Sequence, residues 1–174
     1  IQSFGFSEIA PSSLKRASAI HHVAAVQSEY SLSVRGPELG LVQATKQLGT
    51  ALVAFSPLGR SLLTDRPYTS QKIASIGFLK NNPRFIEPNL SANIKAAEKF
   101  RKLAKDMGTS AAALSVAWLL HQSEHIIAIP GTRSVEHFLE HCEGARLSLS
   151  KEVIAQIESV LPVGWAHGDR YSQQ

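Results

Sequence analysis

A turn of glycine, threonine and arginine follows the last apolar run of the chain, and its residue types suit the binding of an anion. Residues 126–129 (Ile-Ile-Ala-Ile) have the pattern of a buried strand, and Pro130 then opens the turn Gly131-Thr132-Arg133. A helical pattern follows, and the free N–H groups at a helix start favour a negative charge. A guanidinium adds charge-assisted hydrogen bonds. The turn therefore indicates a phosphate site.

The helix expected after this turn carries a second group of side chains that could do chemistry. His137, Glu140 and His141 form the pattern His-x-x-Glu-His, whose helical spacing puts both imidazoles on one face, as zinc requires. The motif lies just after the phosphate turn, however, and no segment is built to supply a third ligand. We therefore predict no metal site here, and solvated surface histidines are the simpler interpretation.

Polar clusters also follow three earlier apolar runs, at the points where strands are expected to end. These clusters are Ser7-Glu8, Gln27-Ser28-Glu29-Tyr30-Ser31 and Ser56-Pro57-Leu58-Gly59-Arg60. In folds built on parallel strands, ligands bind at the carboxyl ends of those strands. We therefore expect the clusters to share one end of the sheet with the phosphate turn.

Apolar runs of strand length alternate with helical patterns along the whole chain. Residues 51–55 and 126–129 are continuously apolar, as in strands buried on both faces, and residues 24–27 are apolar up to Gln27. The first residues of the sequence resemble the middle of another strand. Helices are expected after Pro11-Ser12-Ser13 and Gly36-Pro37, across residues 89–107, after the cap Thr109-Ser110, and across residues 134–143 and 150–161. Residues 61–88 are expected to form a long loop.

This order predicts a parallel α/β fold in a single domain spanning residues 1–174. Four strands at this spacing would form half of a (β/α)8 TIM barrel, although the pattern alone also allows a doubly wound open sheet. The absence of a Gly-x-Gly-x-x-Gly motif argues against a Rossmann domain. Because the sequence opens in an apparent strand without an initiating Met, we expect a chain truncated at its amino terminus.

Composition narrows the class of protein and its partners. Of 174 residues, 44% are hydrophobic and 18% are charged, as in a globular domain, and the net charge is +4. The basic residues are scattered, so we expect no nucleic-acid partner. No apolar run approaches the length of a membrane span, so no membrane partner is expected either. A lone cysteine, Cys142, excludes an intrachain disulfide and favours a cytoplasmic location.

Taken together, the four strand-end clusters resemble the second half of the aldo-keto reductases, in that family's order and spacing. The resemblance covers essentially the whole chain, and Pro-Gly-Thr-Arg is similar to the family's bacterial and fungal branch. It implies strands five to eight of a (β/α)8 barrel with their helices. It also implies an oxidoreductase that binds NADPH and reduces small aldehydes or ketones by hydride transfer.

The resemblance assigns cofactor-binding roles to twelve residues of this chain. Ser7 and Gln27 would hold the nicotinamide carboxamide, and Tyr30 would stack on the ring. The pyrophosphate would be lined by Ser56, Leu58 and Arg60. The 2′-phosphate turn and the adenosine end would comprise Gly131, Thr132, Arg133, His137, Glu140 and His141. The family usually has a permanent cation near His137 and Asn at His141, and neutral histidine does not replace a phosphate cation.

No catalytic residue is predicted in this chain. The family's Tyr, Lys, Asp and His tetrad lies in the half of the barrel that precedes the matching segment, and no residue here matches it. We therefore expect the 174-residue chain alone to be inactive. An alternative is a catalytically silent half-barrel that binds nucleotide or a partner, and that self-associates through its open sheet edges.

Overall fold

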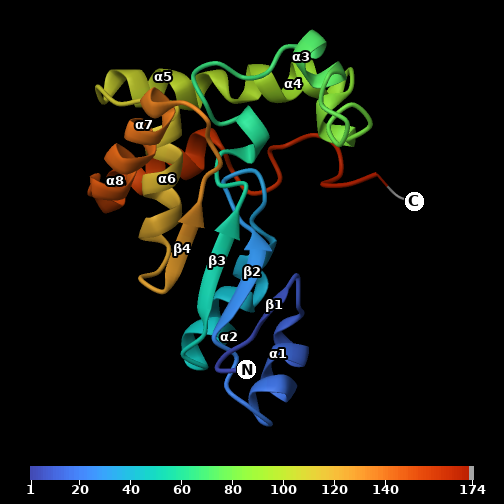
Figure 1. Cartoon of the computed structure of the whole chain (residues 1–174). Helices are drawn as coiled ribbons and strands as arrows, with labels where there is room; N and C mark the ends of the chain where they lie inside the picture. The colour runs from blue at the N-terminus through green and yellow to red at the C-terminus, as the bar shows by residue number, and fades with distance from the viewer. Residues whose placement is uncertain (173–174) are drawn as a thin grey trace.

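A parallel sheet of four strands forms the centre of the protein in the computed structural model, which describes residues 1–172. The strands are β1 (Gly5–Ser7), β2 (Ala25–Glu29), β3 (Ala51–Phe55) and β4 (Ile126–Ile129), and they lie in the order β1-β2-β3-β4. Their arrowheads point to the same end of the sheet, toward the segment that follows β3 (Figure 1). The predicted parallel α/β fold is therefore confirmed.

Eight α-helices connect and cover the strands in the described part of the chain. They are α1 (Pro11–Ser18), α2 (Leu41–Gln47), α3 (Ser70–Ala74), α4 (Asn89–Ala96), α5 (Glu98–Asp106), α6 (Ala111–His121), α7 (Val135–Arg146) and α8 (Lys151–Val160). The hydroxyls of Ser110, Ser134 and Ser150 cap α6, α7 and α8, because each accepts a hydrogen bond from an N–H group in the first turn. Short 3-10 helices occur at Gly36–Leu39, Gly59–Ser61 and Pro83–Phe85.

The helices cover one face of the sheet and leave the other face open. Val26 and Leu52 point toward the helices and are fully buried among side chains such as Trp118 of α6. On the opposite face, Gln27 is exposed and Ile127 retains 51% of its surface. Side chains alternate between the two faces of a strand. The arrangement leaves the interior surface of a half-barrel uncovered.

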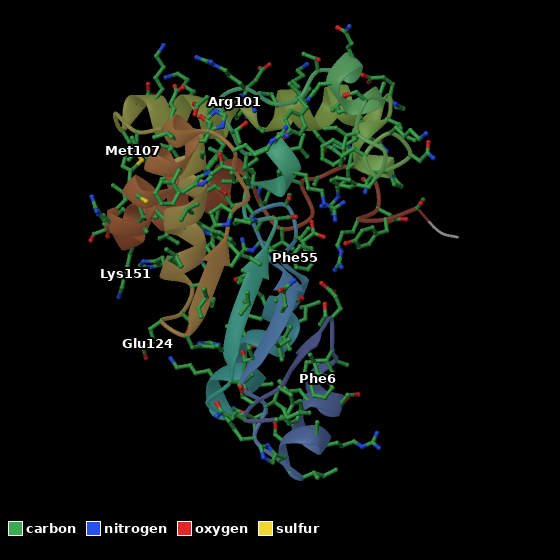
Figure 2. The ribbon with its side chains drawn as sticks, in the orientation of Figure 1. Phe6, Phe55, Arg101, Met107, Glu124 and Lys151 are labelled. Carbon is green, nitrogen blue, oxygen red and sulfur yellow. The ribbon has the colours of Figure 1, made fainter. Side chains whose placement is uncertain are left out.

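The predicted long helix 89–107 is wrong, because two helices meet at Ala97. The Arg101 guanidinium donates hydrogen bonds to the carbonyls of Leu62 and Ile94. In an unbroken helix the Ile94 carbonyl would accept from the N–H of Glu98, so the side chain competes with the helical ladder at the bend. In Figure 2, Arg101 lies on the helical layer at the carboxyl end of the sheet.

The segment 61–88 is more ordered than the predicted loop. It contains α3, whose first turn is capped by Thr69, and the 3-10 helix Pro83–Phe85, which is capped by Asn82. A second apolar cluster holds the segment together, and it consists of Leu62, Ile73, Leu79, Phe85 and Leu90. Phe85, at 3% exposure, is therefore a core residue.

Between residues 1 and 172, no helix is both long and apolar enough to cross a membrane.

Candidate functional site

A cavity of about 890 Å³ opens at the carboxyl ends of β3 and β4. Its walls come from the loop after β3, the residues after α3, the start of α6, the turn after β4 and one face of α7. The volume lies within the range of small-molecule sites. Seven of the twelve predicted residues line this cavity, namely Ser56, Leu58, Arg60, Gly131, His137, Glu140 and His141. Segments far apart in the sequence thus meet as the parallel strand order requires.

The loop after β3 adopts a strained backbone where it borders the cavity. Ser56, Arg60 and Ser61 have φ values of 51°, 53° and 86°, in the left-handed region that non-glycine residues rarely occupy. The hydroxyl of Ser115 in α6 donates a 2.9 Å hydrogen bond to the Pro57 carbonyl and anchors the loop. Such conformations cluster at ligand sites and persist only where the surroundings hold them.

The far end of the cavity is formed by α7 and combines a buried imidazole with a carboxylate. His141 is only 6% exposed, and its Nδ1 atom has no hydrogen-bond partner among residues 1–172. Burial and the neighbouring His137 lower the pKa of His141, which favours its neutral form. Burial raises the pKa of Glu140, while His137 opposes that shift. Among residues 1–172, no group of three or more His, Cys, Asp or Glu side chains lies close enough together to hold a metal ion.

Thr132 and Arg133 lie on the turn but outside the cavity wall. Both are exposed, and the Thr132 hydroxyl accepts a 3.1 Å hydrogen bond from the N–H of Ser134. Ser134 in turn caps α7 by accepting from the N–H of His137. The turn therefore opens a helix as predicted, and the role of Arg133 toward a 2′-phosphate stays a prediction.

Ser7 and Gln27 are brought together on the open face of the sheet. They are register partners on β1 and β2, and Gln27 in turn pairs with Val53 of β3. Both side chains are exposed. They form a row across the interior surface of the half-barrel, separate from the cavity, and their role toward a nicotinamide stays a prediction.

The structure contradicts the stacking role predicted for Tyr30. Its side chain is fully buried and packs edge-to-face on Trp118, with ring centroids 5.8 Å apart. Its hydroxyl donates a 2.9 Å hydrogen bond to Glu38. Burial raises the pKa of Tyr30 most strongly, and the nearby Glu38 carboxylate raises it further. The ring therefore lies on the helix side of the sheet and cannot reach a ligand on the open face.

An aromatic side chain, Phe55, does lie on the open face, at the carboxyl end of β3. It is half-buried and lies in register between Glu29 and Ile129 (Figure 2). Strand alternation places it on the same face as Val53, the register partner of Gln27. Alternation along residues 51–55 puts Phe55 on the face of Val53, but the register that relates this face to Gln27 comes from the structure.

A group of four charged residues, which we call the strand-end ion cluster, connects three strand ends with the carboxyl-terminal tail. It consists of Glu8, Glu29, Arg60 and Arg170. Arg60 and Arg170 contact the same Glu29 carboxylate oxygen at 2.9 and 3.0 Å, and Arg170 also contacts Glu8 at 3.0 Å. Glu29 is only 2% exposed; burial raises its pKa, and the charges of Arg60 and Arg170 oppose that shift. Sequence patterns gave no signal for the roles of Glu29 and Arg170.

Comparison with known sequences identifies the class of protein. The Aldo/keto reductase family profile matches residues 1–162, and the chain belongs to this family. The chain is 33% identical over 171 residues to "Probable aldo-keto reductase 1" of Glycine max, covering 98% of this chain and 49% of that protein. It is 30% identical over 173 residues to "Aldo-keto reductase str7" of Strobilurus tenacellus, covering 98% of this chain and 52% of that protein. The chain thus spans about half the length of these relatives.

Solved structures show the same fold relationship. The glycerol dehydrogenase AKR11B4 from Gluconobacter oxydans aligns with a TM-score of 0.78 at 23% identity, covering all of this chain and 53% of that one. The thermostable aldo-keto reductase Tm1743 aligns with a TM-score of 0.67 at 24% identity, covering 92% of this chain and 48% of that one. The predicted half of a TIM barrel is therefore confirmed.

Proposed function

We propose that this chain is the coenzyme-binding half of an NADPH-dependent reductase that acts on small aldehydes or ketones. The observation that carries the proposal is the cavity, which joins the loop after β3 to the helix-opening turn and to α7. Two of the four strand-end clusters, those after β3 and β4, border this cavity. Ser7 and Gln27, from the other two clusters, lie on the open face of the sheet. Family membership supports the reaction class.

The residues of the cavity fit the adenosine and diphosphate parts of such a coenzyme. The imidazole of His141 lines the cavity, and its lowered pKa favours the neutral ring, which suits packing against a heterocycle. The start of α7 offers backbone N–H groups that suit a phosphate, and the left-handed loop after β3 brings further backbone atoms to the wall. Arg60, which lines the cavity, supplies a positive charge.

When bound, the coenzyme would supply a hydride to the carbonyl carbon of the substrate. The roles of this chain's residues are to bind and orient that coenzyme. Gln27 and Ser7 would hydrogen-bond the carboxamide of the nicotinamide, and Phe55 would offer an apolar surface beside them. The proton for the reduced oxygen would come from outside this chain, so we expect no carbonyl-dependent NADPH oxidation by the 174-residue chain alone.

Arg133 provides the test of the proposed preference for NADPH. We expect Arg133→Ala to weaken NADPH binding about tenfold or more and to leave NADH binding nearly unchanged, because only NADPH offers a 2′-phosphate to a guanidinium. Isothermal titration calorimetry with both coenzymes measures this difference, and Arg16→Ala on the exposed face of α1 is the matched control. Equal losses for the two coenzymes would contradict the assignment.

A second candidate function is that of a silent, partner-pairing half-barrel, and the exposed apolar edges of the sheet favour it. Phe4 and Phe6 lie exposed at the β1 edge, while Ile127, Ile129 and Phe138 lie exposed on β4 and α7 at the opposite edge. Unpaired parallel edges of this kind are templates for association. Sedimentation velocity over a range of concentrations tests whether the chain self-associates through them.

A further inference from the structure

The carboxyl-terminal tail, residues 165–171, is bound across the carboxyl end of the sheet by a series of specific contacts. Trp165 donates a 2.9 Å hydrogen bond to the Leu32 carbonyl, and Asn93 exchanges two hydrogen bonds with the backbone of His167. Arg84 donates to the Gly168 carbonyl at 3.1 Å. The tail thus joins the loop after β2, the segment before α4 and α4 itself (Figure 1).

Arg170 is the tail residue that reaches the strand-end ion cluster. Its carbonyl accepts hydrogen bonds from Asn82 at 2.8 Å and from Arg60 at 3.4 Å. Its guanidinium contacts Glu29 and Glu8, each at 3.0 Å. The ring of Tyr171 lies 4.9 Å from the Arg60 guanidinium and 4.8 Å from that of Arg170, at cation–π distance.

Arg60 belongs to both the ion cluster and the cavity. Its side chain is 10% exposed and lines the cavity wall, while Nη2 contacts the Glu29 carboxylate at 2.9 Å. Glu29 is a buried anion beside this cation, so on its own it would cancel the charge that Arg60 presents to the cavity. Arg170 does not line the cavity, but it shares Glu29 with Arg60. A second cation on the same carboxylate leaves more of the Arg60 charge available to a ligand.

We propose that Arg170 and Glu29 are positioning residues that couple docking of the tail to the binding of a diphosphate beside Arg60. The inference rests on the proposed function, because it takes the diphosphate of a dinucleotide as the ligand of this part of the cavity. Docking of the tail adds the positive charge of Arg170 to the Glu29 carboxylate, so more of the Arg60 charge is available to a diphosphate anion. By linkage, a bound diphosphate holds the tail in place to the same extent.

Other charged groups also act on this balance. Glu8 shares the Arg170 guanidinium with Glu29, and Arg84 adds a further positive charge near Glu29. Arg84 lies near Glu29 and donates hydrogen bonds to the carbonyls of Ser33 and Gly168. The carboxylate of Asp169, also in the tail, acts on Arg84. Arg84 is not part of the cavity wall, so Arg60 remains the cation of the cluster that a ligand meets.

The test is a double-mutant cycle with ADP-ribose, which carries the diphosphate, and with adenosine, which carries no phosphate. We expect Arg170→Gln to weaken ADP-ribose binding by about fivefold or more and to leave adenosine binding unchanged. Adding Glu29→Gln should restore the ADP-ribose affinity, because removal of the buried anion makes the second cation unnecessary. Arg16→Gln on α1 is the control for the loss of one positive charge.

Each remaining outcome of the cycle separates the inference from the proposed function. ADP-ribose binding that is unchanged in Arg170→Gln would overturn the inference and leave the proposed function standing. A double variant that binds no better than Arg170→Gln would also overturn it, because a merely structural role predicts no rescue. If Arg170→Gln fails to fold, Glu29→Gln alone must bind ADP-ribose at least as tightly as the wild type. A folded wild-type chain that binds no ADP-ribose would overturn the proposed function itself.

Discussion

Tyr30 and Phe55 show how one step along the chain at a strand end decides which face of the sheet a side chain occupies. Tyr30 lies just beyond β2, turns toward the helices and is fully buried against Trp118. Phe55 is the last residue of β3 and faces the open side of the sheet. The sequence motif drew attention to Tyr30 because it is aromatic and close to Gln27. Only the register of the strands shows which of the two rings shares a face with Gln27.

Tyr30→Phe tests this structural role. The variant should lose about 1.5 kcal/mol or more of unfolding free energy, because the buried hydroxyl donates to the ionisable Glu38. Nucleotide binding should remain at the wild-type level, since the ring does not reach the cavity. Urea unfolding and NADPH titration measure the two quantities, and Tyr68→Phe, which removes an exposed hydroxyl, is the control for stability alone. A loss of NADPH affinity without loss of stability would restore the stacking role.

His141 should make the stability of the fold depend on pH. Burial lowers its pKa in the folded state below the ordinary value of 6.5. The unfolded chain therefore binds the proton first, and stability that is present above pH 6.5 is lost as the pH falls through the lower, folded-state pKa. In His141→Asn this loss should shrink, with a remainder from His125, whose pKa is also lowered by burial.

Melting temperatures measured from about pH 5 to about pH 8, the range in which histidine side chains usually titrate, test this effect. His121→Asn, at the exposed end of α6, is the matched control and should follow the wild type. A wild-type slope that His141→Asn leaves unchanged would show that His141 does not bind its proton differently in the two states.

At the scale of elements, the sequence predicted best where local pattern and tertiary environment agree. Residues 51–55 and 126–129 form strands with the predicted bounds, because continuous apolar runs suit strands of a parallel sheet. The break at Ala97 was not predictable, since it depends on a guanidinium that also reaches Leu62. Contacts within segment 61–88 likewise depend on a core formed by residues distant in sequence.

The packing of α6 against α7 depends on one close approach at Gly144. A Cβ atom at this position would lie within 3.0 Å of the Ala113 backbone and the Val116 side chain. Gly144→Ala should therefore destabilise the fold by about 1–3 kcal/mol, despite the gain of about 1 kcal/mol in helix propensity. Gly77→Ala is the control, because a Cβ there would meet no atom within 4 Å. Urea unfolding that shows Gly144→Ala to be as stable as the control would contradict the close packing.

At the scale of the whole molecule, the half-barrel brings together sites that the sequence places far apart. The chain order of the strands explains why the clusters after β3 and β4 form one cavity, and this part of the site was predictable from parallel topology. The contact between Arg170 and Glu29 was not, because it depends on the path of an irregular tail. Arg60 illustrates both cases, because the sequence predicted its place at the ligand site but not its ion pair with Glu29.

The most direct test of the central claim is a calorimetric titration of NADPH into the folded 174-residue chain. We predict saturable binding of one NADPH per chain, competed by ADP-ribose, because all the residues proposed to contact the adenosine and the diphosphate belong to this chain. Circular dichroism establishes beforehand that the chain is folded. A folded chain that shows no saturable binding of NADPH would contradict the claim that this half of the barrel contains the coenzyme site.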